Sequence, residues 1–174
     1  TAYEISTRDW SSDVCSSDLG NGSIALSCDV TDLTSIDKSI SSVIKEYSKI
    51  DILVNSAGIA LLNPAESVTE QEWQKTIDVN LGGTFFVAQR VGKEMLKARS
   101  GAIINLASQA ASVALTDHVA YCASKFGVLG VTKVLASEWG SKGITVNSIS
   151  PTVVLTELGK KAWAGEKGDA LKKL

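Results

Sequence analysis

The sequence predicts an α/β protein: a doubly wound parallel sheet with helices on both faces, in three layers. From Gly20 onward, short β-rich runs alternate with longer segments of helical periodicity, as in a parallel sheet with crossover helices. The chain has 174 residues, 44% of them apolar, which is enough for the core of one domain. Neither a repeat nor a linker interrupts this alternation.

Four short runs are predicted to form the strands. They are Ser23 to Cys28, Asp51 to Asn55, Ala102 to Leu106 and Ile144 to Ile149. Each is separated from the next by a segment long enough for a crossover, so we expect the strands to be parallel.

Three helical patterns fill the intervals. Apolar residues from Ile36 to Tyr47 recur at helical spacing and predict an amphipathic crossover helix. Thr69-Glu-Gln-Glu72 matches a capping box, which opens a second helix running to about Lys97. The third pattern, Val119 to Trp139, is apolar over most of its circumference and should be well buried. Gly143 is expected to end the turn that follows it.

The first nineteen residues differ in composition from everything after Gly20 and show no hydrophobic period. Their back-translation resembles the two constant stretches of a sequencing adapter in one frame, with Ser6 and Thr7 filling the variable index. We therefore expect residues 1–19 to be a non-native, adapter-derived segment and the domain to span residues 20–174. Without that segment the net charge changes from -2 to +1.

Composition excludes several classes of protein. The near-neutral charge argues against a nucleic-acid partner. No run approaches the roughly 18 uncharged apolar residues of a membrane span. A basic and then apolar leader is not found, so we expect a cytoplasmic protein. Three cysteines without paired spacing predict neither a disulfide framework nor a metal site.

Tyr121 and Lys125 stand four residues apart in the third helical pattern, so they share one helix face. A fixed cation beside a phenol stabilises the phenolate, and such a pair can exchange a proton with a substrate. The spacing is common by itself. A partly exposed tyrosine and a solvated lysine are the alternative interpretation.

The ends of two predicted strands strengthen the functional interpretation. Ser108 follows the strand that ends at Leu106, and Asn55-Ser-Ala-Gly58 ends the strand before it. Ligand sites of open α/β sheets form at the carboxyl ends of the strands. The glycine would allow the backbone to approach a bound group closely.

The order and spacing of these residues, together with Asn80, resemble the short-chain dehydrogenase/reductase family. Further matches are Asp29-Val30 after the first strand and Asn147-Ser-Ile-Ser-Pro151 at the last. The resemblance covers essentially everything after Gly20. It implies that the sheet is part of a Rossmann-type dinucleotide-binding domain.

The resemblance implies four catalytic roles. Tyr121 would be the general acid/base for the substrate hydroxyl or carbonyl, and Ser108 would hydrogen-bond the reacting oxygen. Lys125 would stabilise the phenolate and hold the nicotinamide ribose. Asn80 would anchor a water that links Lys125 to solvent, although a purely helical role is the alternative for this residue.

The resemblance also implies a cofactor-binding set. Asp29 and Val30 would contact the adenine, and Pro151 to Thr156 would flank the nicotinamide amide. The full set is Asp29, Val30, Asn55, Ala57, Gly58, Tyr121, Lys125, Pro151, Val153, Val154 and Thr156.

Two departures from the family pattern point to a subgroup. Ser56 stands where the family usually has Asn, and Thr152 where it usually has Gly. The sequence around these positions resembles enzymes of polyols and ketoses. That likeness implies a substrate pocket formed by Ser108, Gln109, Leu115, His118 and Trp163. A ring in solvent is the alternative for His118, and a surface contact of a mobile helix for Trp163.

The implied function is an NAD(P)-dependent oxidoreductase that interconverts a secondary alcohol and a ketone, on a sugar alcohol or vicinal diol such as D-threitol. One alternative is a carbonyl reductase acting on L-xylulose or dicarbonyls, and another is a non-catalytic dinucleotide-binding scaffold. NAD is the expected cofactor and NADP the alternative. The family also implies a homo-oligomer, a tetramer.

A complete member of the family would begin with a strand, a Thr-Gly-x-x-x-Gly-x-Gly turn and a helix that receives the pyrophosphate. Gly20-Asn-Gly22 is too short to match that turn. We therefore expect a chain truncated at both ends, whose first strand lacks its neighbour. As written, it should bind dinucleotide poorly and be inactive.

Overall fold

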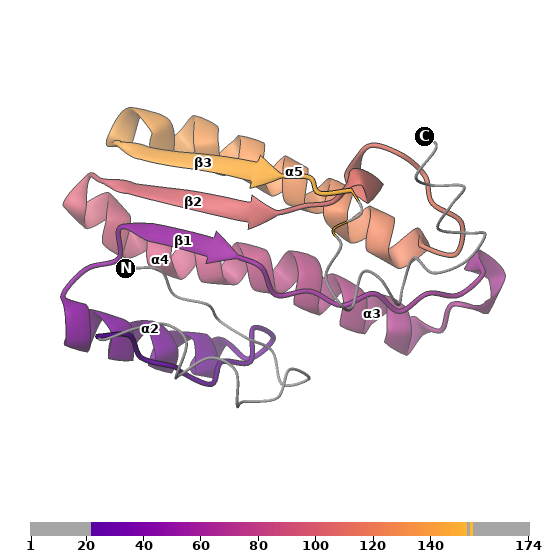
Figure 1. Ribbon diagram of the computed structural model, residues 1–174, viewed down its shortest axis with the longest axis horizontal. Coiled ribbons are helices and arrows are strands. Elements are labelled where there is room, and N and C mark those ends of the chain that lie inside the picture. Colours follow the sequence, from indigo (N-terminus) through magenta and orange to yellow (C-terminus); the bar gives the residue numbers. More distant parts are fainter. Residues whose placement is uncertain (1–21, 153, 155–174) are drawn as a thin grey trace.

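A parallel sheet forms one layer of the computed structural model, which describes residues 22–152 and 154. Its strands are β1 (Ile52–Asn55), β2 (Gly101–Leu106) and β3 (Ile144–Ile149). They pair in the order β1-β2-β3 and all run parallel, as predicted (Figure 1). Because the strands are parallel, their carboxyl ends meet at one edge of the sheet.

Four α-helices accompany the sheet within residues 22–152. They are α2 (Leu33–Tyr47), α3 (Glu70–Ile77), α4 (Thr84–Ala98) and α5 (Val119–Trp139). Helices α4 and α5 lie behind the sheet in Figure 1, because right-handed crossovers between sequential neighbours place their helices on the same face. The described residues therefore contain the sheet and a helix layer on one of its faces.

Several predicted helix boundaries are confirmed. Helix α5 spans the predicted residues from end to end. The capping box opens α3: the hydroxyl of Thr69 accepts from the N–H of Glu72 at 3.2 Å, and the Glu72 carboxylate accepts from the N–H of Thr69 at 2.9 Å. Gly143 has φ +87°, and a Cβ there would collide with the carbonyl of Arg99, so the turn requires glycine.

The predicted continuous helix from Thr69 to Lys97 is wrong in its middle. A π-helical segment, η2 (Asp78–Gly83), separates α3 from α4. The hydroxyl of Thr84 donates to the carbonyl oxygen of Asn80 at 2.7 Å inside this segment. A π-segment adds a residue to the turn without removing the helical spacing on either side, so periodicity does not reveal it.

The predicted strand from Ser23 to Cys28 is also wrong. A strand exists only where a neighbour takes up its N–H and C=O groups, and none of the described strands lies beside this segment. The segment instead runs along α2, where the hydroxyl of Ser39 donates to the carbonyl of Ser27 at 3.3 Å. Cys28 still packs in the core, with 3% of its surface exposed.

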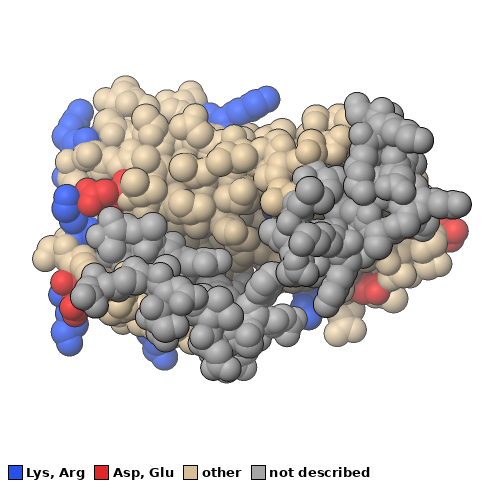
Figure 2. Space-filling model, in the orientation of Figure 1, with Lys and Arg blue, Asp and Glu red and all other residues tan. Residues whose placement is uncertain are grey.

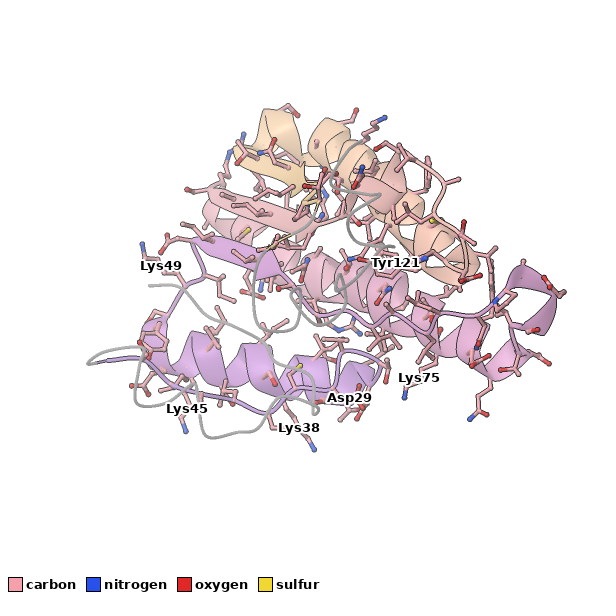
Figure 3. All side chains as sticks on the ribbon, turned by 45° about the vertical axis from the view of Figure 1, so that its right-hand side comes forward. Asp29, Lys38, Lys45, Lys49, Lys75 and Tyr121 are labelled. Atoms are coloured by element: carbon pink, nitrogen blue, oxygen red, sulfur yellow. The ribbon has the colours of Figure 1, made fainter. Side chains whose placement is uncertain are left out.

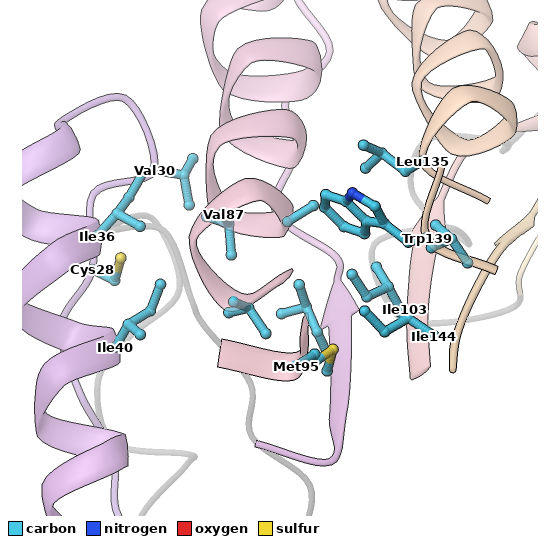
Figure 4. Packing of buried hydrophobic residues seen from close by; sticks show 14 of the residues in the cluster. Cys28, Val30, Ile36, Ile40, Val87, Met95, Ile103, Leu135, Trp139 and Ile144 are labelled. Carbon is cyan, nitrogen blue, oxygen red and sulfur yellow. The ribbon is translucent and has the colours of Figure 1, made fainter. Parts of the chain in front are cut away.

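The core lies between the helices and the sheet (Figure 4). Val87, Val91 and Met95 line the buried face of α4, and Trp139 of α5 packs against Gly92. An ion pair between Arg90 and Asp37 joins α4 to α2. These contacts fix α2, α4 and α5 relative to one another.

Charged side chains gather at the edge where the strands begin, the left end of Figure 2. Lys45 and Lys97 stand in the last turns of α2 and α4, and Lys142 in the last turn of η4 (Gly140–Lys142). Cations are favourable there because the carboxyl end of a helix carries partial negative charge. The candidate site lies at the opposite edge.

Candidate active site

Lys125 is held between the end of β2 and the ring of Tyr121. Its ammonium donates to the carbonyl oxygen of Leu106 at 2.6 Å and lies 5.7 Å from the Tyr121 ring centroid. Only 5% of the residue is exposed. This burial lowers the pKa of Lys125 from 10.5 to about 8. The predicted pair is therefore assembled, with its amine buried against the phenol ring.

Asn80 joins the loop after β1 to η2 and α5. Its amide oxygen accepts from the N–H of Ile59 at 2.8 Å, and its amide nitrogen donates to the carbonyl of Ile59 at 2.9 Å. The same nitrogen donates to the hydroxyl of Ser124 at 3.1 Å. The side chain is fully buried. It therefore fixes the loop that carries Gly58 close to the helix that carries Tyr121 and Lys125.

Because Gly58 has no side chain, a space is left beside Asn80 and Lys125, and we refer to it as the corner at Gly58. A Cβ on Gly58 would lie 3.3 Å from the amide oxygen of Asn80 and 3.7 Å from the Lys125 ammonium. Any side chain here would occupy the space in front of the amine. The glycine therefore leaves room for a bound group to reach Lys125.

Ser108 and Pro151 reach the same edge of the sheet. Ser108 precedes the short helix η3 (Gln109–Ala111), and its hydroxyl accepts from the N–H of Ala110 at 3.1 Å. The N–H of Gln109 donates to the carbonyl of Pro151 at 2.9 Å. The short helix η3 packs on α5, the helix that carries Tyr121. Three predicted residues therefore lie on the same side of the sheet as Tyr121, namely Ser108, Gln109 and Pro151.

His118 lies directly before α5. Its ring is edge-on to the ring of Tyr121, with 6.0 Å between centroids and 75° between planes. The backbone N–H of His118 donates to the backbone carbonyl of Leu115 at 3.3 Å. The structure therefore brings two of the predicted substrate-binding residues, His118 and Leu115, into the turn next to the phenol.

Asp29 lies apart from this group, at the amino end of α2 (Figure 3). Its carboxylate accepts from the N–H of Thr31 at 2.9 Å and from its hydroxyl at 2.7 Å. Asp29, Ile59 and Gln74 contribute to the lining of an open cavity of about 1210 Å³. Ile59 stands next to Gly58 in the chain, so the cavity reaches from Asp29 to the edge of the catalytic group.

Val30 and Asn55, both predicted to contact the cofactor, have buried side chains. Val30 packs in the core, where a Cβ on Gly83 would lie 2.7 Å from its Cγ2. The amide of Asn55 donates to the amide oxygen of Asn105 at 2.9 Å and to the carbonyl of Thr84 at 3.3 Å. Both side chains therefore hold the sheet and helices together, and only their backbones could face a ligand.

The last predicted residues belong to the segment that follows β3. Val154 is 55% exposed. Val153, Thr156 and Trp163 lie outside the described residues, as do residues 1–19.

Sequence reasoning missed Ser124, which lies between Tyr121 and Lys125 and contacts Asn80. It also missed Asn105, which bonds to Asn55 and to the hydroxyl of Thr132 at 2.9 Å. A signal was present: Ser124 and Thr132 are small polar residues eight apart on a largely apolar helix, so they share one face.

Comparison with known proteins assigns the fold and the family. The sequence profile described as short chain dehydrogenase matches residues 11–167. The chain belongs to the short-chain dehydrogenase family. A crystal structure of gox2181 covers 84% of the chain with a TM-score of 0.81 and 34% identity, and the chain covers 58% of that structure.

Two curated relatives of the short-chain dehydrogenase family are more similar in sequence. D-threitol dehydrogenase of Mycolicibacterium smegmatis is 63% identical over 147 residues, which is 84% of this chain and 56% of the relative. NAD-dependent glycerol dehydrogenase of Listeria innocua is 54% identical over 151 residues, 87% of this chain and 59% of the relative. The chain thus spans little more than half the length of these curated relatives.

Proposed function

We propose that the protein containing this chain is an NAD(P)-dependent dehydrogenase that interconverts a secondary alcohol and a ketone on a sugar alcohol or vicinal diol. The observation that carries the proposal is the buried Lys125 ammonium 5.7 Å from the Tyr121 ring centroid. Both curated relatives are named for polyols, D-threitol and glycerol, which supports this substrate class.

The chain's own residues would handle the proton and the substrate oxygen. Tyr121 is the general acid/base, and the cation of Lys125 stabilises its phenolate form. The hydroxyl of Ser108 hydrogen-bonds the reacting oxygen. Gln109 and His118 offer further donors and acceptors to the other hydroxyls of a polyol, and a site built around such bonds rejects substrates that lack them.

The arrangement fits a nicotinamide dinucleotide, which would supply the hydride acceptor or donor when bound. Lys125 would hold its ribose hydroxyls across the open corner at Gly58, and Asp29 would face its adenine end from the cavity. NAD is our first choice, since one curated relative is named as NAD-dependent. NADP is the alternative, because the strand whose last residue selects the ribose phosphate is not among those described.

The test is turnover by the full-length protein that carries this sequence, measured by the absorbance of reduced nicotinamide with D-threitol, glycerol or L-xylulose. Tyr121→Phe should lower kcat by about a hundredfold or more because it removes the proton-transfer group. Tyr47→Phe, on α2 and away from the site, is the matched control and should keep full activity.

Each outcome separates the candidate functions. Turnover retained by Tyr121→Phe would overturn the mechanism. Dinucleotide binding without turnover of any alcohol or ketone would favour the non-catalytic scaffold. Reduction of L-xylulose with NADPH in clear preference to polyol oxidation would favour the carbonyl reductase.

We also propose that the protein forms a homo-oligomer, a tetramer, and works in the cytoplasm. Phe126 and Val134 of α5 are 51% and 54% exposed, which gives this helix an outward apolar face suited to a second copy. With η4, α5 is long and apolar enough to cross a membrane, yet its inner face packs on β3 and α3 as a core helix does. Light scattering and cell fractionation test the two proposals.

A further inference from the structure

Ser124 connects the two helical segments that carry the candidate catalytic groups. Its hydroxyl donates to the carbonyl oxygen of Tyr121 at 2.7 Å and accepts from the amide nitrogen of Asn80 at 3.1 Å. The residue is fully buried. A continuous line of hydrogen bonds therefore runs from Ile59 in the loop after β1, through Asn80 in η2 and Ser124, to the backbone of Tyr121.

We propose that Ser124 is a positioning residue, whose buried hydroxyl sets the first turns of α5 against Asn80 so that Tyr121 and Lys125 face the corner at Gly58. This inference rests on the proposed dehydrogenase function. It assigns Ser124 no contact with substrate or cofactor.

Three features make the hydroxyl suited to this role. Among the described residues it is the only group of α5 that hydrogen-bonds to the Asn80 side chain, since the other bonds of that amide go to Ile59. A buried amide N–H without an acceptor is costly, so the pair favours a single arrangement. The amide oxygen of Asn80 would also lie 3.3 Å from a Cβ on Gly58, so a shift of Asn80 would change the space through which a ligand reaches Lys125.

The same helix contains a matched comparison. The hydroxyl of Thr132 accepts from the amide of Asn105 at 2.9 Å and donates to the carbonyl of Val128 at 2.7 Å. It too is buried, on the same helix face. Both hydroxyls link a buried asparagine to α5, but Thr132 does so in the sheet core and Ser124 beside the catalytic pair.

The experiment compares Ser124→Ala with Thr132→Val in the full-length protein. Ser124→Ala should lower kcat for polyol oxidation about tenfold, change KM less than about twofold, and shift the pH profile of kcat, because a small misplacement of reacting groups is costly. Thr132→Val should lower the melting temperature and leave both kcat and the pH profile unchanged. Ser124→Ala with wild-type kcat and pH profile, or equal kinetic effects of the two variants, would overturn the proposal.

A second readout needs no turnover. NMR titration of the Lys125 side chain should give different midpoints in wild type and Ser124→Ala, and equal midpoints in wild type and Thr132→Val. If no alcohol is turned over, the dehydrogenase proposal fails while this titration still decides the role of Ser124. If Ser124→Ala does not fold, Ser124→Cys, which keeps a weaker donor and acceptor at the same position, should show a smaller change of the same kind; unchanged midpoints would overturn the proposal.

Discussion

The ammonium of Lys125 donates a 2.6 Å hydrogen bond to the carbonyl oxygen of Leu106, the last residue of β2. Burial lowers the pKa of Lys125 from 10.5 to about 8. Between these two values the unfolded chain binds more protons than the folded one. The free energy of unfolding must therefore rise with pH across this range. The buried amine costs most stability below about pH 8, where both states are protonated.

Lys125→Met tests this because it keeps an unbranched side chain and removes the titrating group. Between about pH 7 and pH 10, the free energy of unfolding of wild type should rise by about 2 to 3 kcal/mol relative to the variant. Urea unfolding at both pH values measures the difference. A constant difference between the two proteins would show that Lys125 keeps its usual pKa in the fold.

The buried amides of Asn55 and Asn105 are bonded to each other, and we expect the loss of this contact to affect folding stability alone. Asn105 accepts from Asn55 at 2.9 Å and donates to Thr132 at 2.9 Å, and it is fully buried. Asn105→Ala removes both hydrogen bonds and leaves a cavity. It also leaves the buried polar groups of Asn55 and Thr132 without these partners. It should lower the free energy of unfolding by about 3 to 5 kcal/mol.

A double-mutant cycle checks the physical reason for that loss. If the bond to Thr132 contributes, Asn105→Ala and Thr132→Val should be non-additive, with a coupling of about 1 kcal/mol or more. Additive losses in urea unfolding would show that the bond to Thr132 contributes nothing, which leaves the cavity and the lost bond to Asn55 as the causes.

The elements predicted well are those specified locally. Helix α5 needs only a long run of largely apolar residues, and α3 begins where Thr69 and Glu72 complete a capping box. β3 has the predicted bounds, and β1 and β2 differ from prediction by one residue, because each run is a short apolar stretch between clear breaks. The pairing of Tyr121 with Lys125 follows from helical geometry in the same way.

What sequence missed depends on contacts between distant segments. Ser23 to Cys28 has the composition of a strand but no neighbour among the described strands. Asn55 is the last residue of β1, where a ligand-facing residue is expected, yet its side chain bonds to Asn105, fifty residues away in the chain. The π-segment at Asn80 likewise depends on contacts with Ile59 and Ser124, which no local pattern contains.

Glu72 gives α3 a stability that should depend on pH. Its carboxylate accepts from the N–H and the hydroxyl of Thr69, both at 2.9 Å, and from the amide of Asn63 at 2.8 Å. The Thr69 backbone bond, followed by its hydroxyl bond, lowers the pKa of Glu72 below 4.5. The stabilisation is therefore complete above that value and is lost as pH falls through the lower folded pKa.

Glu72→Gln should accordingly be less stable than wild type at neutral pH, with the difference shrinking as the solution is acidified. Thermal unfolding along a pH series measures it. Glu70→Gln, in the same first turn of α3 but outside this set of bonds, is the control. A gap that stays constant from neutral to acid pH would contradict the assigned role.

Replacing either of two glycines in the helix layer by alanine should change the free energy of unfolding, in opposite directions at the two positions. A Cβ on Gly92 would lie 2.5 Å from Cη2 and 2.6 Å from Cζ3 of Trp139, whose ring is buried between α4 and the sheet. A Cβ on Gly140, at the end of α5, meets nothing within 4 Å, and its φ of -56° suits any residue. Alanine favours helix over glycine by up to about 1 kcal/mol at either position.

The contact with Trp139 therefore decides whether Gly92→Ala raises or lowers the free energy of unfolding. Gly140→Ala should raise the free energy of unfolding by a few tenths to about 1 kcal/mol, since nothing opposes the gain in propensity. Gly92→Ala should lower it by about 1 to 3 kcal/mol, because the new Cβ would overlap the buried indole of Trp139 and overpacking exceeds that gain. Urea unfolding of the two variants under one condition measures both signs. A stabilised Gly92→Ala would mean that α4 and α5 can separate at this contact, which would contradict the close approach of Gly92 to Trp139.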